Sequence, residues 1–230
     1  MKFLVISDIH GSVDNIEKLD SQFKSVDAVI FGGDFAAFGS PETGKPVLDK
    51  LLSKHDTIFS VIGNCDSPEF LDAIDGADIS VENTLTFHDG LAFAGAGGGT
   101  KFSGDTLFER DEDEILSDFS LVDASAENCV DENGKWNSLV LVMHNPPKDT
   151  DCDMIPGGIH VGSQKLREYI EKYEPLLVVT GHIHESAGVC RVGSTTVINP
   201  GALLEGKYGI VEVEKEGGSW VVKSAELKKL

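Results

Sequence analysis

Carboxylate, amide and imidazole side chains follow five short apolar stretches of this 230-residue sequence. In the first, the apolar run within residues 4–11 reads as a buried strand that ends in Asp8 and His10, two residues apart. Residues i and i+2 of an extended chain point the same way, so we expect both side chains to face one point just beyond the strand. Oxygen and nitrogen donors at one point suit a borderline divalent metal ion. Asp-x-His is common by chance, so the prediction depends on the other four stretches.

Those four apolar runs end in residues of the same kind. The residues that follow them are Asp34, Asn64, His144, His182 and His184. In α/β sheets, ligands bind beyond the carboxyl ends of the strands, so parallel strands would bring all seven side chains to one rim. Seven donors are more than one ion needs if it keeps positions open for a substrate. The pattern therefore predicts two ions that share a bridging carboxylate.

Each residue also has an ordinary structural interpretation. Asp8 could cap a helix, Asp34 could belong to a turn, and His144 could be a core histidine with satisfied hydrogen bonds. Short matches are weak support one at a time, and for each residue alone the structural interpretation is preferred. Five coincident strand ends reverse this preference in favour of a metal site.

Charge and composition restrict the class of protein. The 39 acidic residues outnumber 19 basic ones, for a formal charge of −20. This balance argues against a nucleic-acid polymer as partner, because proteins that bind one present basic surfaces. It also argues against anionic membranes, and no apolar run approaches the ~18–20 residues that span a bilayer. With no signal-peptide pattern and four scattered cysteines, we expect a cytoplasmic protein with free thiols.

Strand and helix patterns alternate along the first half of the chain. Apolar spacing predicts helices at 13–23, 46–54, 68–74 and 163–173, with Ser12 as the cap of the first. Residues 96–136 are polar and glycine-rich, and we expect a loop there with one helix near 111–118 that leans over the site. The tail from Gly188 reads as a β-meander. Strand–helix alternation implies parallel βαβ units, so we predict one α/β domain over residues 1–230.

The motifs that follow the strands resemble those of a known family, the calcineurin-like metallophosphoesterases. The order and rough spacing agree from residue 3 to about 201. The motifs are Asp8-x-His10, Gly33-Asp34, Gly63-Asn64, His144 and Gly181-His182-x-His184. Residues 97–115, 144–163 and 181–201 further resemble the Icc-like branch, relatives of cyclic-nucleotide phosphodiesterases. The resemblance implies a four-layer α-β-β-α sandwich, with two mixed β-sheets flanked by helices (the metallo-dependent phosphatase fold).

The resemblance also implies a ligand set for each ion. One ion would be held by Asp8, His10, Asp34 and His184, and the other by Asp34, Asn64, His144 and His182. Asp34 would then bridge the two. Imidazole ligands favour transition metals over Mg²⁺, so Mn²⁺ is the favoured ion, with Fe, Zn²⁺, Ni²⁺ or Co²⁺ as alternatives.

We therefore predict a metal-dependent phosphoric ester hydrolase that acts on small-molecule phosphoesters, with phosphodiesters favoured. A hydroxide bridging two ions ~3.5–4 Å apart would attack phosphorus, with Asp34 and Asn64 as catalytic residues. The alternatives are a small-molecule phosphomonoesterase and a catalytically silent metal-binding scaffold on the same fold. The complete ligand set disfavours the scaffold. A homo-oligomer is compatible with the sequence.

Cys65 departs from the family pattern, because many relatives have histidine after the asparagine. A thiol is a poor replacement for imidazole at pH 7. Either another group such as His160 acts as the leaving-group acid, or the substrates have good leaving groups. Cys65 could equally be a small buried filler, and His160 a loop histidine that caps the next helix. Asp34 also lacks the following arginine of protein serine/threonine phosphatases, which disfavours that activity.

Overall fold

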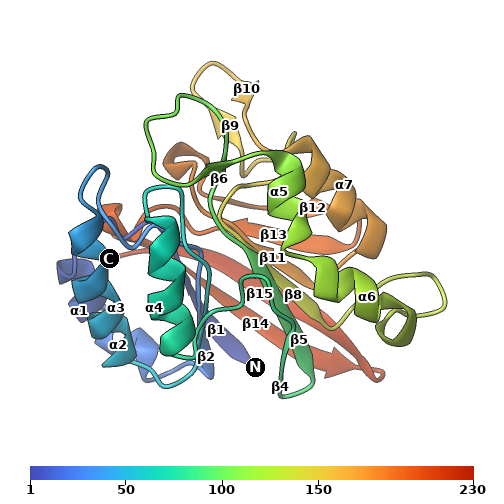
Figure 1. The fold of residues 1–230 in the computed structure, drawn as a ribbon. Coiled ribbons are helices and arrows are strands. Elements are labelled where there is room, and N and C mark those ends of the chain that lie inside the picture. Colours follow the sequence, from blue (N-terminus) through green and yellow to red (C-terminus); the bar gives the residue numbers. More distant parts are fainter.

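Two mixed β-sheets pack face to face at the centre of the computed structural model, which describes all 230 residues (Figure 1). In the first sheet the strand order is β15 (Ser219–Lys229), β14 (Lys207–Glu216), β1 (Lys2–Ile6), β2 (Ala28–Phe31) and β3 (Ile58–Ser60). In the second it is β12 (Gly188–Val192), β13 (Thr195–Asn199), β11 (Leu177–Val179), β8 (Leu139–Met143), β5 (Leu91–Ala96) and β4 (Thr86–His88).

The strands that precede the candidate ligands are parallel within each sheet. In the first sheet β1, β2 and β3 run parallel. In the second, β5, β8, β11 and β13 do so, while β4 and β12 are antiparallel edges. The expected βαβ arrangement of the first half is therefore present, and the carboxyl ends of the strands meet at common rims.

Side-chain alternation along the strands explains the layers. Leu4 and Ile6 of β1 pack in the core beneath the helices, whereas Phe3 and Val5 pack against the second sheet. A strand buried on both faces reads as a continuous apolar run, as these do.

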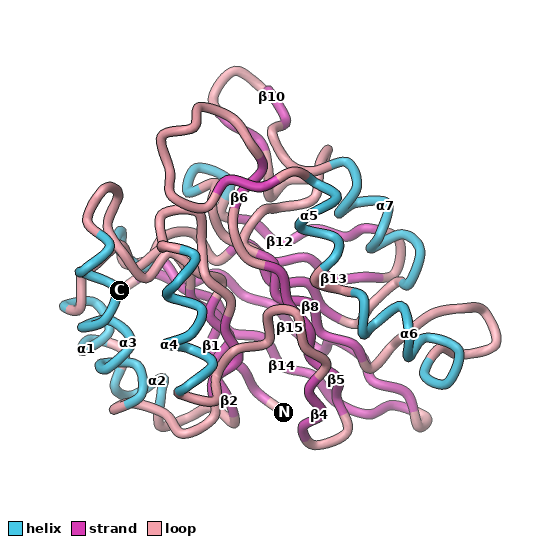
Figure 2. Tube along the Cα trace, viewed as in Figure 1, coloured by secondary structure: helices cyan, strands magenta, loops and turns pink.

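Helices cover the outer face of each sheet (Figure 2). The first sheet carries α1 (Asp14–Lys18), α2 (Asp20–Phe23), α3 (Gly44–Leu52) and α4 (Leu71–Gly76). The second carries α5 (Glu112–Ser117), α6 (Ser120–Cys129) and α7 (Gln164–Tyr173). The predicted four-layer α-β-β-α sandwich is confirmed.

Three local expectations were wrong. The helix expected over 13–23 divides into α1 and α2 at Leu19, and its N-cap is Val13 without a capping side chain, rather than Ser12. Residues 96–136 hold two helices, of which α6 was not expected, and both pack on the second sheet. The tail is not one meander, because β12 and β13 join the second sheet while β14 and β15 form the edge of the first.

The helices of the molecule are short, and none combines the length and the apolar character needed to cross a bilayer.

Candidate metal centre

The loops after β1, β2, β3, β8 and β11 converge and bring the seven predicted ligands together. Three sets of donor atoms at this point, one of which includes the thiol of Cys65, each lie within 4.8 Å of one another. These sets are Asp8, His10 and His184; Asp8, Asp34 and His144; and His10, Asp34 and Cys65. Asn64 joins them through a contact with His144, and His182 through a contact with Asn64.

Left-handed backbone, rather than extended strand, aims several of these side chains. Asp8, His10, Asp34 and His182 have φ angles of 55°, 49°, 62° and 67°. The strand β1 already ends at Ile6, so Asp8 and His10 are not part of an extended strand. The two side chains do face one point, as expected, but side-chain alternation along a strand is not the cause. Left-handed backbone is uncommon for residues other than glycine and costs of order 1 kcal/mol or more, and it clusters at functional sites.

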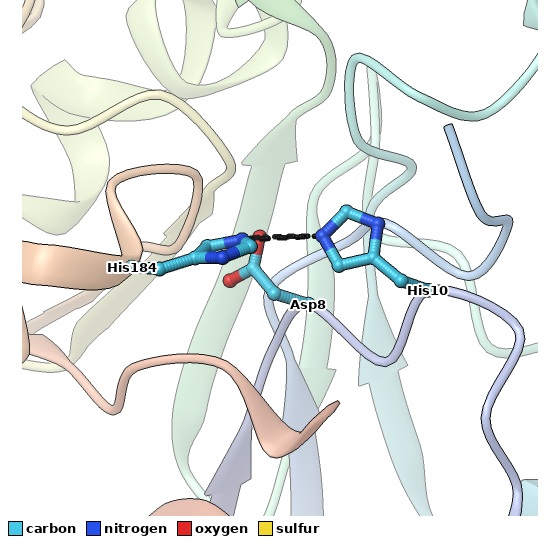
Figure 3. A group of neighbouring side chains, drawn as sticks. All are labelled: Asp8, His10 and His184. Atoms are coloured by element: carbon cyan, nitrogen blue, oxygen red, sulfur yellow. Dashed lines mark hydrogen bonds and ion pairs between the residues drawn. The ribbon is translucent and has the colours of Figure 1, made fainter. Parts of the chain in front are cut away.

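The first group of donors comprises Asp8, His10 and His184 (Figure 3). The Nε2 atoms of His10 and His184 lie 3.1 Å apart. Oδ1 of Asp8 is 3.2 Å from Nε2 of His184 and 3.9 Å from Nε2 of His10. Three donor atoms, from the loop after β1 and the loop after β11, therefore face one point.

The second group is centred on Asn64. Its Oδ1 atom lies 2.8 Å from Nε2 of His144 and 2.8 Å from Nδ1 of His182. His144 is fully buried and Asn64 nearly so. Two imidazole nitrogens and one amide oxygen thus converge beside the first group.

Asp34 stands between the two groups. Its Oδ2 atom is 3.6 Å from Nε2 of His10 in the first group and 3.4 Å from Nε2 of His144 in the second. Its Oδ1 atom accepts a hydrogen bond of 2.8 Å from the backbone N–H of Cys65. Among the carboxylates of the site, only that of Asp34 contacts imidazole rings of both groups, which is the position that a bridging carboxylate requires.

Hydrogen bonds at Nδ1 turn the Nε2 atoms of two histidine rings toward the centre of the site. Nδ1 of His144 lies 2.7 Å from the carbonyl of Gly32, and Nδ1 of His10 lies 3.2 Å from that of Ala36. Carbonyls only accept, so each Nδ1 donates, and in the neutral form of each ring that binds a metal the Nε2 lone pair would face the centre. Oδ2 of Asp8 is buried without any hydrogen-bond partner. Oxygen and nitrogen lone pairs gathered without donors fit divalent cations.

Electrostatics also favour positive charge at this point. Burial opposes protonation of His144, but the charge of Asp34 and its contact with the ring prevail and raise the pKa of His144 to about 9. Burial and the neighbouring charged His144 lower the pKa of His182 to about 4. Without an ion the carboxylates hold a proton on His144, which a bound divalent cation would replace, while His182 stays a neutral donor at pH 7.

Asp66 is a supporting residue that the sequence analysis missed. Its carboxylate accepts backbone N–H groups from Gly63, Asp34, Phe35 and Ala36 at 2.7–3.2 Å, and it is fully buried. These bonds fix the turns that carry Asp34 and Asn64. Gly33 is needed beside them, since its φ is +96° and an added Cβ would lie 2.7 Å from the backbone nitrogen of Gly63. The sequence signal that could have identified this role was an acidic residue two positions after Asn64.

A cavity of about 380 Å³ opens beside Asn64 and His182. Its walls come from the 99–109 loop and from the hairpin of β9 (Met154–Ile155) and β10 (Ile159–His160). The lining combines apolar and polar side chains with a single cation: Thr100, Lys101, Phe102, Ser103, Thr106, Glu109, Ile155, Val161 and Ile183. Gly99 lies against the Asn64 and His182 side chains, so the glycine run reaches the site.

His160 and Cys65 occupy different positions relative to this cavity. Nδ1 of His160 lies 2.7 Å from Oδ1 of Asp153, and the residue is not part of the cavity wall, although the next residue, Val161, is. Cys65 is nearly buried beside Asp34, and burial together with the nearby carboxylates raises the pKa of its thiol far above neutrality. That His160 acts as the leaving-group acid stays a prediction.

The four-layer fold and the convergent donor atoms are consistent with a metal-dependent phosphoesterase, and comparison with known proteins shows the family. The chain belongs to the calcineurin-like phosphoesterase family, whose pattern matches residues 1–186. The uncharacterized protein MJ1162 of Methanocaldococcus jannaschii is 31% identical over 206 residues, which cover 87% of this chain and 88% of that protein.

Solved structures share the fold at low sequence identity. TT1561 of Thermus thermophilus superposes with a TM-score of 0.72 at 19% identity, covering 99% of this chain and 98% of that one. A structure described as a novel archaeal phosphodiesterase matches with a TM-score of 0.55 at 19% identity over 100% of both chains.

Proposed function

We propose that this protein is a dinuclear metal-dependent phosphoesterase that hydrolyses small-molecule phosphoesters and prefers phosphodiesters. The position of Asp34 carries the proposal, because its Oδ2 atom lies within 3.6 Å of a histidine in each donor group. Asp8, His10 and His184 would complete one ion site with Asp34, and Asn64, His144 and His182 the other. Mn²⁺ is the ion that we propose, on the nitrogen and oxygen donor set.

Bound divalent ions would supply a nucleophile at neutral pH and neutralise charge on the phosphoryl oxygens. The protein's own contribution is orientation. Asp34 is fixed by Asp66 and Cys65, and His10 and His144 are fixed through their Nδ1 atoms. Such outer hydrogen bonds hold ring orientation and tautomer before a ligand arrives.

The cavity beside Asn64 supports the preference for diesters. Lys101 is the single cation in the wall, so beyond the metal ions the protein offers little positive charge to a phosphomonoester dianion. A diester carries one charge less and a second organic group. Phe102, Ile155 and Val161 give that group an apolar surface.

The leaving group receives little help from Cys65, because its raised pKa makes the thiol a poor proton donor at neutral pH. His160 is the alternative acid. Its hydrogen bond to Asp153 raises the pKa of the ring and so favours the protonated form. We infer that the protein either uses His160 or prefers substrates with good leaving groups.

Initial rates with Mn²⁺ on bis(p-nitrophenyl) phosphate and p-nitrophenyl phosphate test the proposal. The variant Asp34→Asn should lose turnover together with bound metal, while the exposed Asp56→Asn matched control should retain both. Faster monoester turnover would instead support the small-molecule phosphomonoesterase. Two bound ions without turnover of either compound would mean a pocket selective for other phosphoesters, and neither turnover nor bound metal would support the catalytically silent scaffold. Unchanged turnover in Asp34→Asn would exclude the assigned centre.

A further inference from the structure

Two of the four cysteines lie in direct contact, away from the metal centre. The Sγ atoms of Cys152 and Cys190 are 3.7 Å apart, although the residues are 38 positions apart in the chain. Neither cysteine belongs to the donor groups of the centre. Cys65 and Cys129 are free thiols without a neighbouring sulfur. The pair is therefore a separate feature of the molecule.

The two sulfurs differ in accessibility. Cys152 is fully buried in the core beneath α7, in the segment before β9. Cys190 is half-buried on β12, with its side chain on the α7 side of the sheet beside Val197. The Cys152 thiol stabilises the thiolate of Cys190 by hydrogen bonding, which lowers the pKa of Cys190. Cys190 thus presents the more reactive and more accessible sulfur.

The backbone around the pair allows closure. A disulfide has an S–S length of about 2.05 Å, so the sulfurs must approach by about 1.7 Å. Cys190 lies on the edge strand β12, which pairs only with β13. An edge strand can shift by this amount without breaking pairing on a second side.

We propose that Cys152 and Cys190 are a thiol-oxidation site that closes to a reversible disulfide in the presence of hydrogen peroxide. The Cys190 thiolate attacks a peroxide oxygen, the O–O bond breaks, and a sulfenic acid forms with release of water once the leaving oxygen takes up a proton. The sulfur of Cys152 then attacks the Cys190 sulfur and expels the second oxygen as water. Two thiols are oxidised and one peroxide is reduced to two waters.

The bond would tie β12 to the wall of the cavity. Cys152 precedes Asp153, whose carboxylate accepts hydrogen bonds from the N–H groups of Thr150 and Gly162 and contacts His160. The carbonyl of Cys152 also accepts a bond from the Asn199 amide, which in turn bonds the carbonyl of Ile183 in the cavity lining. Oxidation would therefore brace the base of the β9–β10 hairpin.

Peptide mapping of the full-length protein tests this site. After treatment with hydrogen peroxide, trypsin should release residues 149–165 linked to residues 173–191, two mass units below the sum of the free peptides. Dithiothreitol should separate them. The link should persist in Cys129→Ala and be absent in Cys190→Ala and Cys152→Ala.

Thermal unfolding gives an independent readout. The disulfide would close the loop between Cys152 and Cys190. We expect this to raise Tm by about 5–10 °C in the oxidised wild type, with no oxidation-dependent shift in Cys190→Ala. Oxidation of Cys190 to sulfinic acid without a cross-link, or unchanged peptides after peroxide, would overturn the proposal. Because neither measurement uses catalysis, failure here is distinct from failure of the phosphoesterase assignment.

Discussion

Nε2 of His10 lies 3.1 Å from Nε2 of His184, although 174 residues separate them in the chain. Each ring is anchored by its own surroundings: His10 by the Ala36 carbonyl, and His184 by the carboxylate of Asp8. The contact joins the loop after the first strand to the loop after β11, and so unites the two sheets at the centre. The first ion site depends on this pairing.

Replacing His184 should separate the two ion sites. In His184→Asn we expect the metal content to fall from two ions per chain to one, because Asp34, Asn64, His144 and His182 do not require His184. Elemental analysis after dialysis measures this, with His88→Asn on β4 as the control. Retention of both ions would contradict the division into two groups.

Asp66 should matter for both stability and metal affinity. Asp66→Asn replaces an accepting oxygen with an amide nitrogen, so at least one buried N–H among Asp34, Phe35, Ala36 and Gly63 loses its partner. We expect a loss of about 2–3 kcal/mol in the free energy of unfolding and about 10–100-fold weaker metal binding. Urea unfolding in EDTA and metal titration measure the two effects. Wild-type values in both would show that these bonds are dispensable, and Asp56→Asn is the matched control.

Glu82 should make stability fall as pH rises. Burial and the charge of Asp118 raise its pKa from the ordinary 4.5 to about 7 in the folded protein. The folded state therefore holds the proton more tightly, and the stabilisation is complete below pH 4.5 and lost as pH rises through about 7. This group alone contributes a fall of about 3 kcal/mol over that window.

Urea unfolding between pH 4.5 and 7.5 checks the Glu82 prediction. Glu82→Gln should lack that component of the pH dependence, whereas the exposed Glu132→Gln should follow the wild type. Parallel pH profiles for Glu82→Gln and the wild type would contradict the assignment.

Cys65 tests how the leaving group is protonated. If an acid is missing there, Cys65→His should raise kcat on alkyl diesters, whose leaving groups are poor, and change p-nitrophenyl esters little. Cys65→Ala controls for the altered volume. Equal rates on poor leaving groups in wild type and Cys65→His would argue that the thiol is only a buried filler. His160→Gln examines the alternative acid by the same comparison.

The parallel strands and the convergence of the ligands followed from the sequence because both depend on local pattern. Apolar runs such as 139–143 can form only buried strands in this context, and β8 has those bounds. A parallel strand delivers the residue after its carboxyl end to a common rim, so His144 and His182 could be placed together from order alone.

Other features depend on contacts between distant segments. The boundary between α1 and α2 and the division of the tail between two sheets were set by packing, not by apolar spacing. The contact between Cys152 and Cys190 could not be predicted either, since neither residue carries a local signal.

The sequence by itself determined which residue types end the strands, and hence the chemistry of the centre. Tertiary structure alone decided how those residues meet. Left-handed backbone at Asp8 and Asp34 is unfavourable in isolation and persists because hydrogen bonds from distant segments, such as those that Asp66 accepts, hold it. Such compensation exists only once the two sheets are packed, which is why no local pattern predicts it.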